Sequence, residues 1–117
     1  MEFPVQSLGK AYGESTGRGT QFIIGIPARE MGLGDSDELV LIQGIIDAYL
    51  EEEDGLVLID YKTDHVPEGS PEQGAKMLAE RYRVQLDYYE RALTQLTEKH
   101  VKERIIYSLA LQMSINV

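Results

Sequence analysis

The 117-residue chain contains no cysteine, so it can form no disulfide, no thiolate zinc site and no cysteine-ligated iron–sulfur cluster. No apolar run approaches the ~20 residues that a membrane span needs, and the start lacks the basic-then-apolar pattern of a signal peptide. A G-x-x-x-x-G-K-[ST] phosphate loop is also missing. We therefore expect one cytoplasmic domain without a membrane partner, built on an ordinary hydrophobic content of 43%.

Positive charge is scarce. The chain contains eleven Lys and Arg residues and twenty Asp and Glu residues, which gives a net charge of −9. Such a chain repels nucleic acid, because phosphates are usually met by Lys and Arg. A DNA-binding function would require the few bases to gather locally, or affinity supplied from elsewhere.

The most informative stretch runs from residue 44 to residue 63 and reads GIIDAYLEEEDGLVLIDYKT. Two apolar strands, 38–51 and 56–62, flank Asp54-Gly55, a dipeptide that favours a tight hairpin turn. A two-residue loop at that dipeptide would pair Glu53 with Leu56, Tyr49 with Asp60 and Asp47 with Lys62.

This register puts Asp47, Asp60 and Lys62 on one face of the hairpin, because strand side chains alternate. Asp47 and Asp60 are then diagonal neighbours, roughly 7–8 Å apart at Cα. A slip of one residue would turn Asp47 to the other face.

Two carboxylates and an ammonium group on a half-buried sheet face are costly unless they are paired or hold a metal. Oxygen ligands suit Mg²⁺, or Mn²⁺ as a substitute, and the Tyr61 backbone carbonyl is a further candidate oxygen. Lys62 could orient a water or stabilise charge on a phosphate. A structural cross-strand Asp–Lys pair is the alternative.

The rest of the chain predicts an α/β fold on a mixed sheet. Residues 1–19 are expected to form a loosely held arm, 21–26 a buried strand, 31–37 a loop, 103–111 a strand and 113–117 a last short strand. Ser70-Pro71 starts a long helix that reaches about Glu98, with a kink or break near Tyr82. Its expected buried stripe consists of Leu78, Tyr82, Leu86, Tyr89, Leu93 and Leu96.

Two further acidic or titratable features are expected to be solvated. Glu51 to Asp54 form an acidic hairpin tip, which stays in water more readily than it holds a metal. His65 lies in the loop after the second hairpin strand and is left out of the predicted site.

The order of G-I-I-D, D-Y-K-T and Q-x-x-x-Y over residues 20–117 resembles the PD-(D/E)xK nuclease superfamily. More narrowly, IQGIIDAYLEEEDGLVLIDYKTD is similar to the nuclease domain of AddA/RexA-type helicase-nuclease subunits of the RecB-like family. The resemblance implies a restriction-endonuclease-like mixed sheet flanked by helices. It also implies that Gln85 and Tyr89 reach the metal site or the DNA backbone; the alternative is a Gln at the stripe edge and a core Tyr.

The same resemblance implies a Mg²⁺-dependent DNA exonuclease acting in double-strand break repair and recombination. Its partners would be DNA, the helicase portion of the same subunit and an AddB/RexB-type subunit. The family carries a helix with a His or Glu ligand well upstream of the first Asp, but Glu14 does not match that motif, so we expect this helix to be missing.

Two other interpretations stay open. A nuclease fold can persist as a catalytically silent module that guides DNA or docks subunits, which the acidic surface and the missing helix favour. A plain α/β domain with a paired Asp and Lys is the third interpretation.

Overall fold

The computed structural model describes residues 14–66 and 68–117, except the side chains of residues 14–16. Five strands and one long helix make up most of this part. The elements are β1 (Glu14–Pro27), a 3₁₀ turn (Ala28–Met31), β2 (Leu39–Glu52), β3 (Gly55–Lys62), α1 (Pro71–Thr97), β4 (Val101–Ser108) and β5 (Met113–Asn116).

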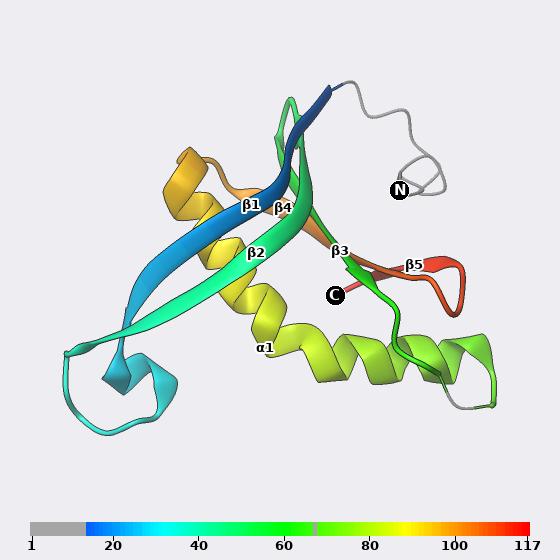
Figure 1. Cartoon of the computed structure of the whole chain (residues 1–117), viewed down its shortest axis with the longest axis horizontal. Coiled ribbons are helices and arrows are strands. Elements are labelled where there is room, and N and C mark those ends of the chain that lie inside the picture. Colours follow the sequence, from blue (N-terminus) through cyan, green and yellow to red (C-terminus); the bar gives the residue numbers. More distant parts are fainter. Residues whose placement is uncertain (1–13, 67) are drawn as a thin grey trace.

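The strands form one mixed sheet in the order β1-β2-β3-β4-β5. The β3–β4 pair is parallel and is connected through α1, whereas the other three pairs are antiparallel. Figure 1 shows β1 and β2 as a long two-stranded ribbon that curves away from β3, β4 and β5. The predicted α/β class with a mixed sheet is confirmed.

The hairpin between β2 and β3 has a different turn from the predicted one. Glu52 pairs with Gly55 and Ala48 with Ile59, so the loop is Glu53-Asp54. The left-handed φ of 151° falls on Gly55, where a Cβ would also lie 3.0 Å from the His100 ring. The predicted register was therefore wrong by two residues. An even shift preserves side-chain parity, so the predicted common face is unaffected.

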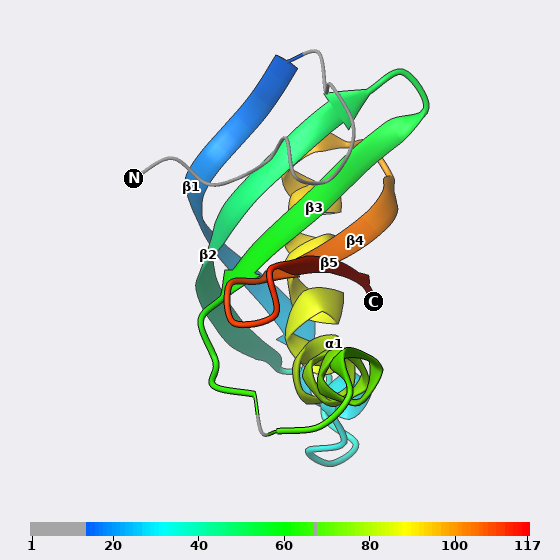
Figure 2. The ribbon, with the colours of Figure 1, turned by 90° about the vertical axis from the view of Figure 1, so that its right-hand side faces the viewer.

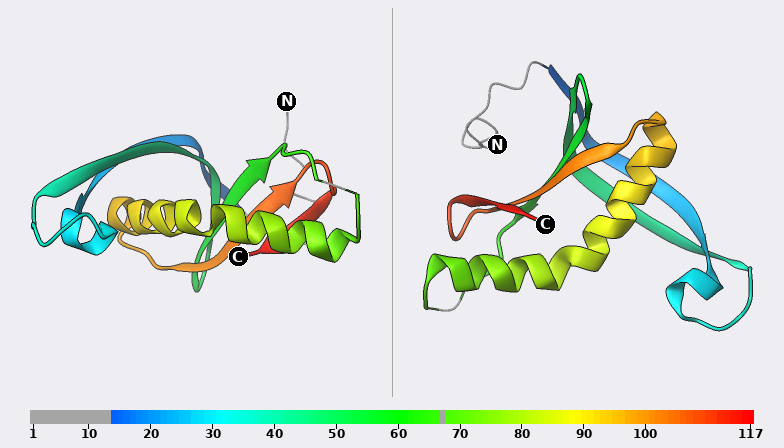
Figure 3. Two further views of the ribbon diagram at one scale, coloured as in Figure 1. Left: turned by 90° about the horizontal axis from the view of Figure 1, so that it is seen from below. Right: turned by 180° about the vertical axis from the view of Figure 1, so that it is seen from behind.

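Helix α1 begins as the sequence predicts. The Ser70 hydroxyl accepts a hydrogen bond from the Gln73 amide at 3.2 Å, and Pro71 occupies the first helical position. The helix is continuous to Thr97 but bends about midway (Figure 1), and it crosses one face of the sheet (Figure 3).

The main core lies between α1 and the sheet. It joins Leu78, Leu86 and Leu93 of the helix to apolar residues of all five strands, including Phe22, Ile46, Leu58, Ile106 and Ile115. A smaller cluster on the other face contains Ala48, Leu50, Val57, Ile59 and Ile105. Figure 2 shows the sheet with α1 behind it. The predicted stripe is wrong only at Leu96, which is 55% exposed near the end of the helix.

Two strand boundaries also differ from those predicted. Strand β1 begins at Glu14, inside the segment expected to be a loose arm, because it follows the long β2 partner to Glu51. The predicted strand 103–111 ends at Ser108. There the Ser108 hydroxyl accepts the Leu111 amide at 3.0 Å, and Gln112 adopts a φ of 52°, so the chain turns into β5.

Residues 1–13 of the predicted arm lie outside the described residues. Within the described ranges, α1 is the longest helix, and no helix is both long and apolar enough to cross a membrane.

A candidate active site where two strands separate

The predicted acidic residues lie where β2 parts from β3. The last paired residues of the two strands are Ala48 and Ile59. At the next residue of β2, Asp47, the side chain makes the contact with β3. Asp47 Oδ2 accepts the backbone N–H of Tyr61 at 2.9 Å. The carboxylate thus satisfies a donor that the departing strand no longer pairs, and it is held beside Asp60.

Strand β2 also changes its facing at Asp47. Ile46 packs into the core under α1, and Tyr49 packs against the same core although it is three residues further along. Strict alternation would put residues three apart on opposite faces. The partner strand is irregular at the same level, since Gly19 has a φ of +58° between the pairs formed by Arg18 and Thr20. This local twist lets Ile46 join the core while Asp47 still meets Asp60.

Asp60 and Lys62 lie on the α1 side of β3 and form a close ion pair. Asp60 is 3% exposed, and its Oδ2 lies 3.0 Å from Lys62 Nζ. The Lys62 side chain is only 16% exposed, so its charge is also largely removed from water. Charges buried to this extent need partners on several sides.

Helix α1 supplies those partners through Gln85 and Tyr89. Lys62 Nζ donates to Gln85 Oε1 at 2.9 Å, and Gln85 Nε2 donates to the Tyr89 hydroxyl at 3.0 Å. The two residues are four apart, one helical turn, which places both on the same face. Gln85 therefore contacts the lysine of the predicted site directly, whereas Tyr89 is linked to it through Gln85 and also packs against the core.

Gly44 and Phe22 hold Tyr89 in place. The Phe22 and Tyr89 rings make an edge contact with centroids 5.4 Å apart. A Cβ on Gly44 would lie 3.0 Å from Phe22 and 3.3 Å from Tyr89, so only glycine fits there without displacement. The sequence pattern marked Gly44 only as part of a motif and gave no sign of this packing role.

The Tyr61 carbonyl points to the side that β2 has vacated. The next carbonyl, that of Lys62, accepts the Leu109 amide on the β4 side. Successive carbonyls of an extended strand point to opposite edges, and a residue's N–H and C=O share one edge. The Tyr61 carbonyl therefore faces the same edge as its N–H, which reaches Asp47.

The pKa of Asp60 is raised from 3.8 to about 6, and burial is the largest cause. The neighbouring Asp47 carboxyl contributes to this rise, while the hydrogen-bonding and charge contacts with Lys62 oppose it. Burial likewise raises the pKa of Tyr89, and the charges of Asp60 and Asp47 add to this effect. The protein thus holds Asp60 in a place where its ionisation is unfavourable.

These residues fit a hard divalent cation. Asp60 Oδ2 is buried and lies in close contact with the Lys62 ammonium, 3.0 Å away. A buried carboxylate oxygen in this state is suited to a cation, and oxygen donors are those that Mg²⁺ prefers. Over residues 14–66 and 68–117, however, no three His, Cys, Asp or Glu side chains gather as a metal site.

The acidic hairpin tip, Glu14 and His65 lie elsewhere. At the hairpin tip, Glu52 and Asp54 pair with Lys102, and Glu51 pairs with Lys99. Glu14 lies in β1, and its side chain is not among those described. His65 follows β3 in the loop, as the sequence predicts, and is exposed.

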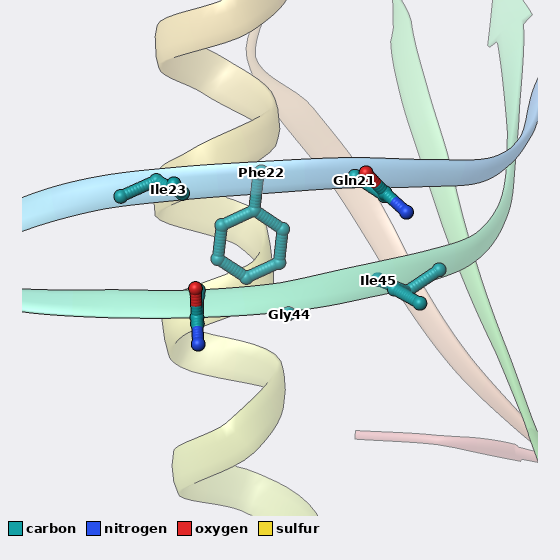
Figure 4. A pocket seen from close by; sticks show the side chains of 6 residues that line it. Gln21, Phe22, Ile23, Gly44 and Ile45 are labelled. Atoms are coloured by element: carbon teal, nitrogen blue, oxygen red, sulfur yellow. The ribbon is translucent and has the colours of Figure 1, made fainter.

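A hollow of about 660 Å³ on the β1–β2 ribbon shares Phe22 and Gly44 with the packing around Tyr89, but Asp47, Asp60 and Lys62 do not line it. Its lining consists of Gln21, Phe22, Ile23, Gln43, Gly44 and Ile45, and Figure 4 shows Phe22 extending from one strand across to the other. No carboxylate or ammonium group lines it, so it lacks the groups that metal-assisted chemistry needs.

Comparison with known proteins identifies the family of the chain. Residues 6–115 match the family described as the PD-(D/E)XK nuclease superfamily. The chain is 58% identical over 83 residues to an ATP-dependent helicase/nuclease subunit of Lachnoclostridium phytofermentans, covering 71% of this chain and 6% of that protein. It is 46% identical over 99 residues to the protein of the same name from Acetivibrio thermocellus, covering 80% and 8%. The chain thus spans less than a tenth of the length of these relatives.

Proposed function

Since the chain belongs to the PD-(D/E)XK nuclease superfamily, we propose that it is a Mg²⁺-dependent DNA nuclease domain, in which Mn²⁺ can substitute. The observation that carries the proposal is the meeting of Asp47, Asp60 and Lys62 at the point where β2 leaves β3. Residues that are 13 and 15 positions apart in sequence converge there, on a face covered by α1.

Asp47, Asp60 and the Tyr61 carbonyl would hold the ion. When bound, the ion acts as a Lewis acid that lowers the pKa of water and offsets charge on a phosphate. Asp47 is already oriented by the Tyr61 amide, and Asp60 offers a buried carboxylate that the Lys62 ammonium contacts.

Lys62 would supply the positive charge beside the reacting phosphodiester. Its ammonium is held against Asp60 and Gln85, which leaves donor capacity for a water or a phosphate oxygen. A preoriented cation in a largely dry site stabilises charge that develops in the transition state. Gln85 and Tyr89 would keep the lysine in this position.

The curated relatives are ATP-dependent helicase/nuclease subunits, and this chain matches a small part of each. We place the chain as the nuclease domain of such a protein, which trims DNA ends exonucleolytically during double-strand break repair and recombination in the cytoplasm. The helicase portion and an AddB/RexB-type partner would deliver the strand. This arrangement also accounts for a net charge of −9, because the domain need not capture DNA unaided.

The test is cleavage of labelled single-stranded DNA by the 117-residue chain in Mg²⁺ and in Mn²⁺. We expect cleavage by the parent, and a loss of at least a hundredfold in Asp60→Asn and in Lys62→Met. Glu53→Gln is the matched control, because this exposed acid at the hairpin tip lies outside the site. Cleavage by Asp60→Asn at the parental rate would refute the assignment.

A catalytically silent module is the second candidate. The net charge of −9 favours it, because an acidic domain repels the phosphates of nucleic acid. Calorimetry with Mn²⁺ separates the two: a chain that neither binds Mn²⁺ nor cuts DNA at high protein concentration would be the docking or guiding module.

A further inference from the structure

The Lys62 ammonium has a third neighbour that the nuclease motifs do not include. Its Nζ lies 4.0 Å from the centroid of the Tyr82 ring, over the ring face. An ammonium at this distance is attracted by the negative face of the aromatic ring. Because Asp60, Gln85 and Tyr82 all contact the one nitrogen, the lysine is held by groups from both β3 and α1.

Tyr82 is itself fixed at its hydroxyl. That group donates to Asp64 Oδ2 at 2.6 Å, and the same oxygen accepts Arg81 Nη1 at 2.8 Å. The hydrogen bond from Tyr82, more than the Arg81 charge, lowers the pKa of Asp64, so the carboxylate stays ionised as an acceptor. Asp64 lies two residues after Lys62, which ties the exit of β3 to the ring that covers the lysine.

We propose that the ring of Tyr82 makes it a positioning residue for Lys62. The inference rests on the proposed nuclease function and adds a residue to it. Tyr82 lies three positions before Gln85 and seven before Tyr89, so all three share one face of α1. The ring face attracts the positive charge of the ammonium and accepts no hydrogen bond from it. One N–H of Lys62 therefore stays available for the substrate or for water.

A purely packing role for Tyr82 is the competing explanation, since the ring also touches the main core. The two explanations differ in what the side chain must be. Packing needs apolar bulk, which Leu supplies, whereas positioning needs an aromatic face, which Phe and Trp supply and Leu does not.

The first measurement is NMR of the lysine side chains in the metal-free 117-residue chain, with Lys62→Arg identifying the Lys62 signals. A methylene group beside an ammonium that lies over a ring face is displaced upfield by the ring current. We expect this displacement in the parent and in Tyr82→Phe, and its loss in Tyr82→Leu. A Lys62 signal at the position of exposed lysines in the folded parent would overturn the proposal, whatever the enzymatic activity.

The second measurement is steady-state cleavage of single-stranded DNA in Mn²⁺. We expect Tyr82→Leu to lose about tenfold in kcat with KM nearly unchanged, and Tyr82→Phe and Tyr82→Trp to stay within about threefold of the parent. Equal losses in Tyr82→Leu and Tyr82→Phe, or a loss in KM alone, would overturn the proposal. A folded parent that cuts no DNA would refute the proposed function, while the NMR result would still decide whether Tyr82 positions the lysine.

Discussion

Replacing Asp60 by Asn should stabilise the metal-free protein at neutral pH. The folded chain holds the pKa of Asp60 at about 6 against 3.8 for a free aspartate, chiefly because the group is buried and Asp47 adjoins it. A pKa difference of one corresponds to about 1.4 kcal/mol, so keeping this carboxylate ionised costs the fold about 3 kcal/mol at pH 8. Asparagine has nearly the same shape and carries no charge.

The sign follows from proton binding. A carboxyl group with a raised pKa binds its proton more strongly in the folded state than in the unfolded state. Its contribution to stability is fully present below pH 4, is lost as the pH rises to about 6, and stays lost above that. The advantage of Asp60→Asn should therefore be only about 1 kcal/mol at pH 4.5 and reach about 3 kcal/mol at pH 8, as an upper bound.

Thermal unfolding of the parent and the variant between pH 4.5 and 8, in EDTA, measures this difference. For a domain of this size, 1 kcal/mol shifts Tm by about 4 °C, so Asp60→Asn should unfold about 10 °C higher at pH 8. A variant that is less stable than the parent at pH 8, or a difference that does not change with pH, would refute the reasoning.

Asp64→Asn is the matched control. It makes the same substitution at an acid two residues beyond Lys62, where the surroundings lower the pKa of the carboxyl instead of raising it. Hydrogen bonds from Tyr82 and Arg81 lower the pKa of Asp64, so its charged form stabilises the fold. That contribution is present above pH 4 and is lost as the pH falls through its lowered pKa. Asp64→Asn should therefore be the less stable protein at pH 8, with a deficit that shrinks toward acid.

Three further outcomes are expected. Mg²⁺ at ten times its Kd should stabilise the parent by about 1.4 kcal/mol at pH 8 and by much less at pH 5, and it should not stabilise Asp60→Asn. Equal stabilisation of the parent at both pH values would contradict the claim that Asp60 binds the ion in its ionised form. Gly44→Ala should lower cleavage by displacing the Tyr89 and Phe22 rings, with aromatic NMR shifts as the structural check; unchanged shifts would contradict the close packing. Ser70→Ala should cost about 1 kcal/mol in urea unfolding through loss of the helix cap, and Ser70→Asp should restore it; a deficit that persists in Ser70→Asp would point away from capping.

The hairpin shows how the sequence prediction could err in register and still locate the site. The Asp54-Gly55 dipeptide predicted a turn with these two residues as its loop. In the structure only Gly55 of the two has a positive φ, and the loop consists of Glu53 and Asp54. Alternation along a strand has a period of two, so a shift of two residues changes every cross-strand neighbour and no facing.

Local sequence alone determined the order and type of the main elements, the helix cap at Ser70 and the common face of Asp60 and Lys62, because each depends on neighbours in the chain. Only the tertiary structure decided where β2 parts from β3, that Gly44 makes room for Tyr89, and that the Tyr82 ring covers Lys62. These contacts join residues up to 45 positions apart, such as Gly44 and Tyr89. They depend on the curvature of the sheet and the path of α1, which no short-range pattern encodes.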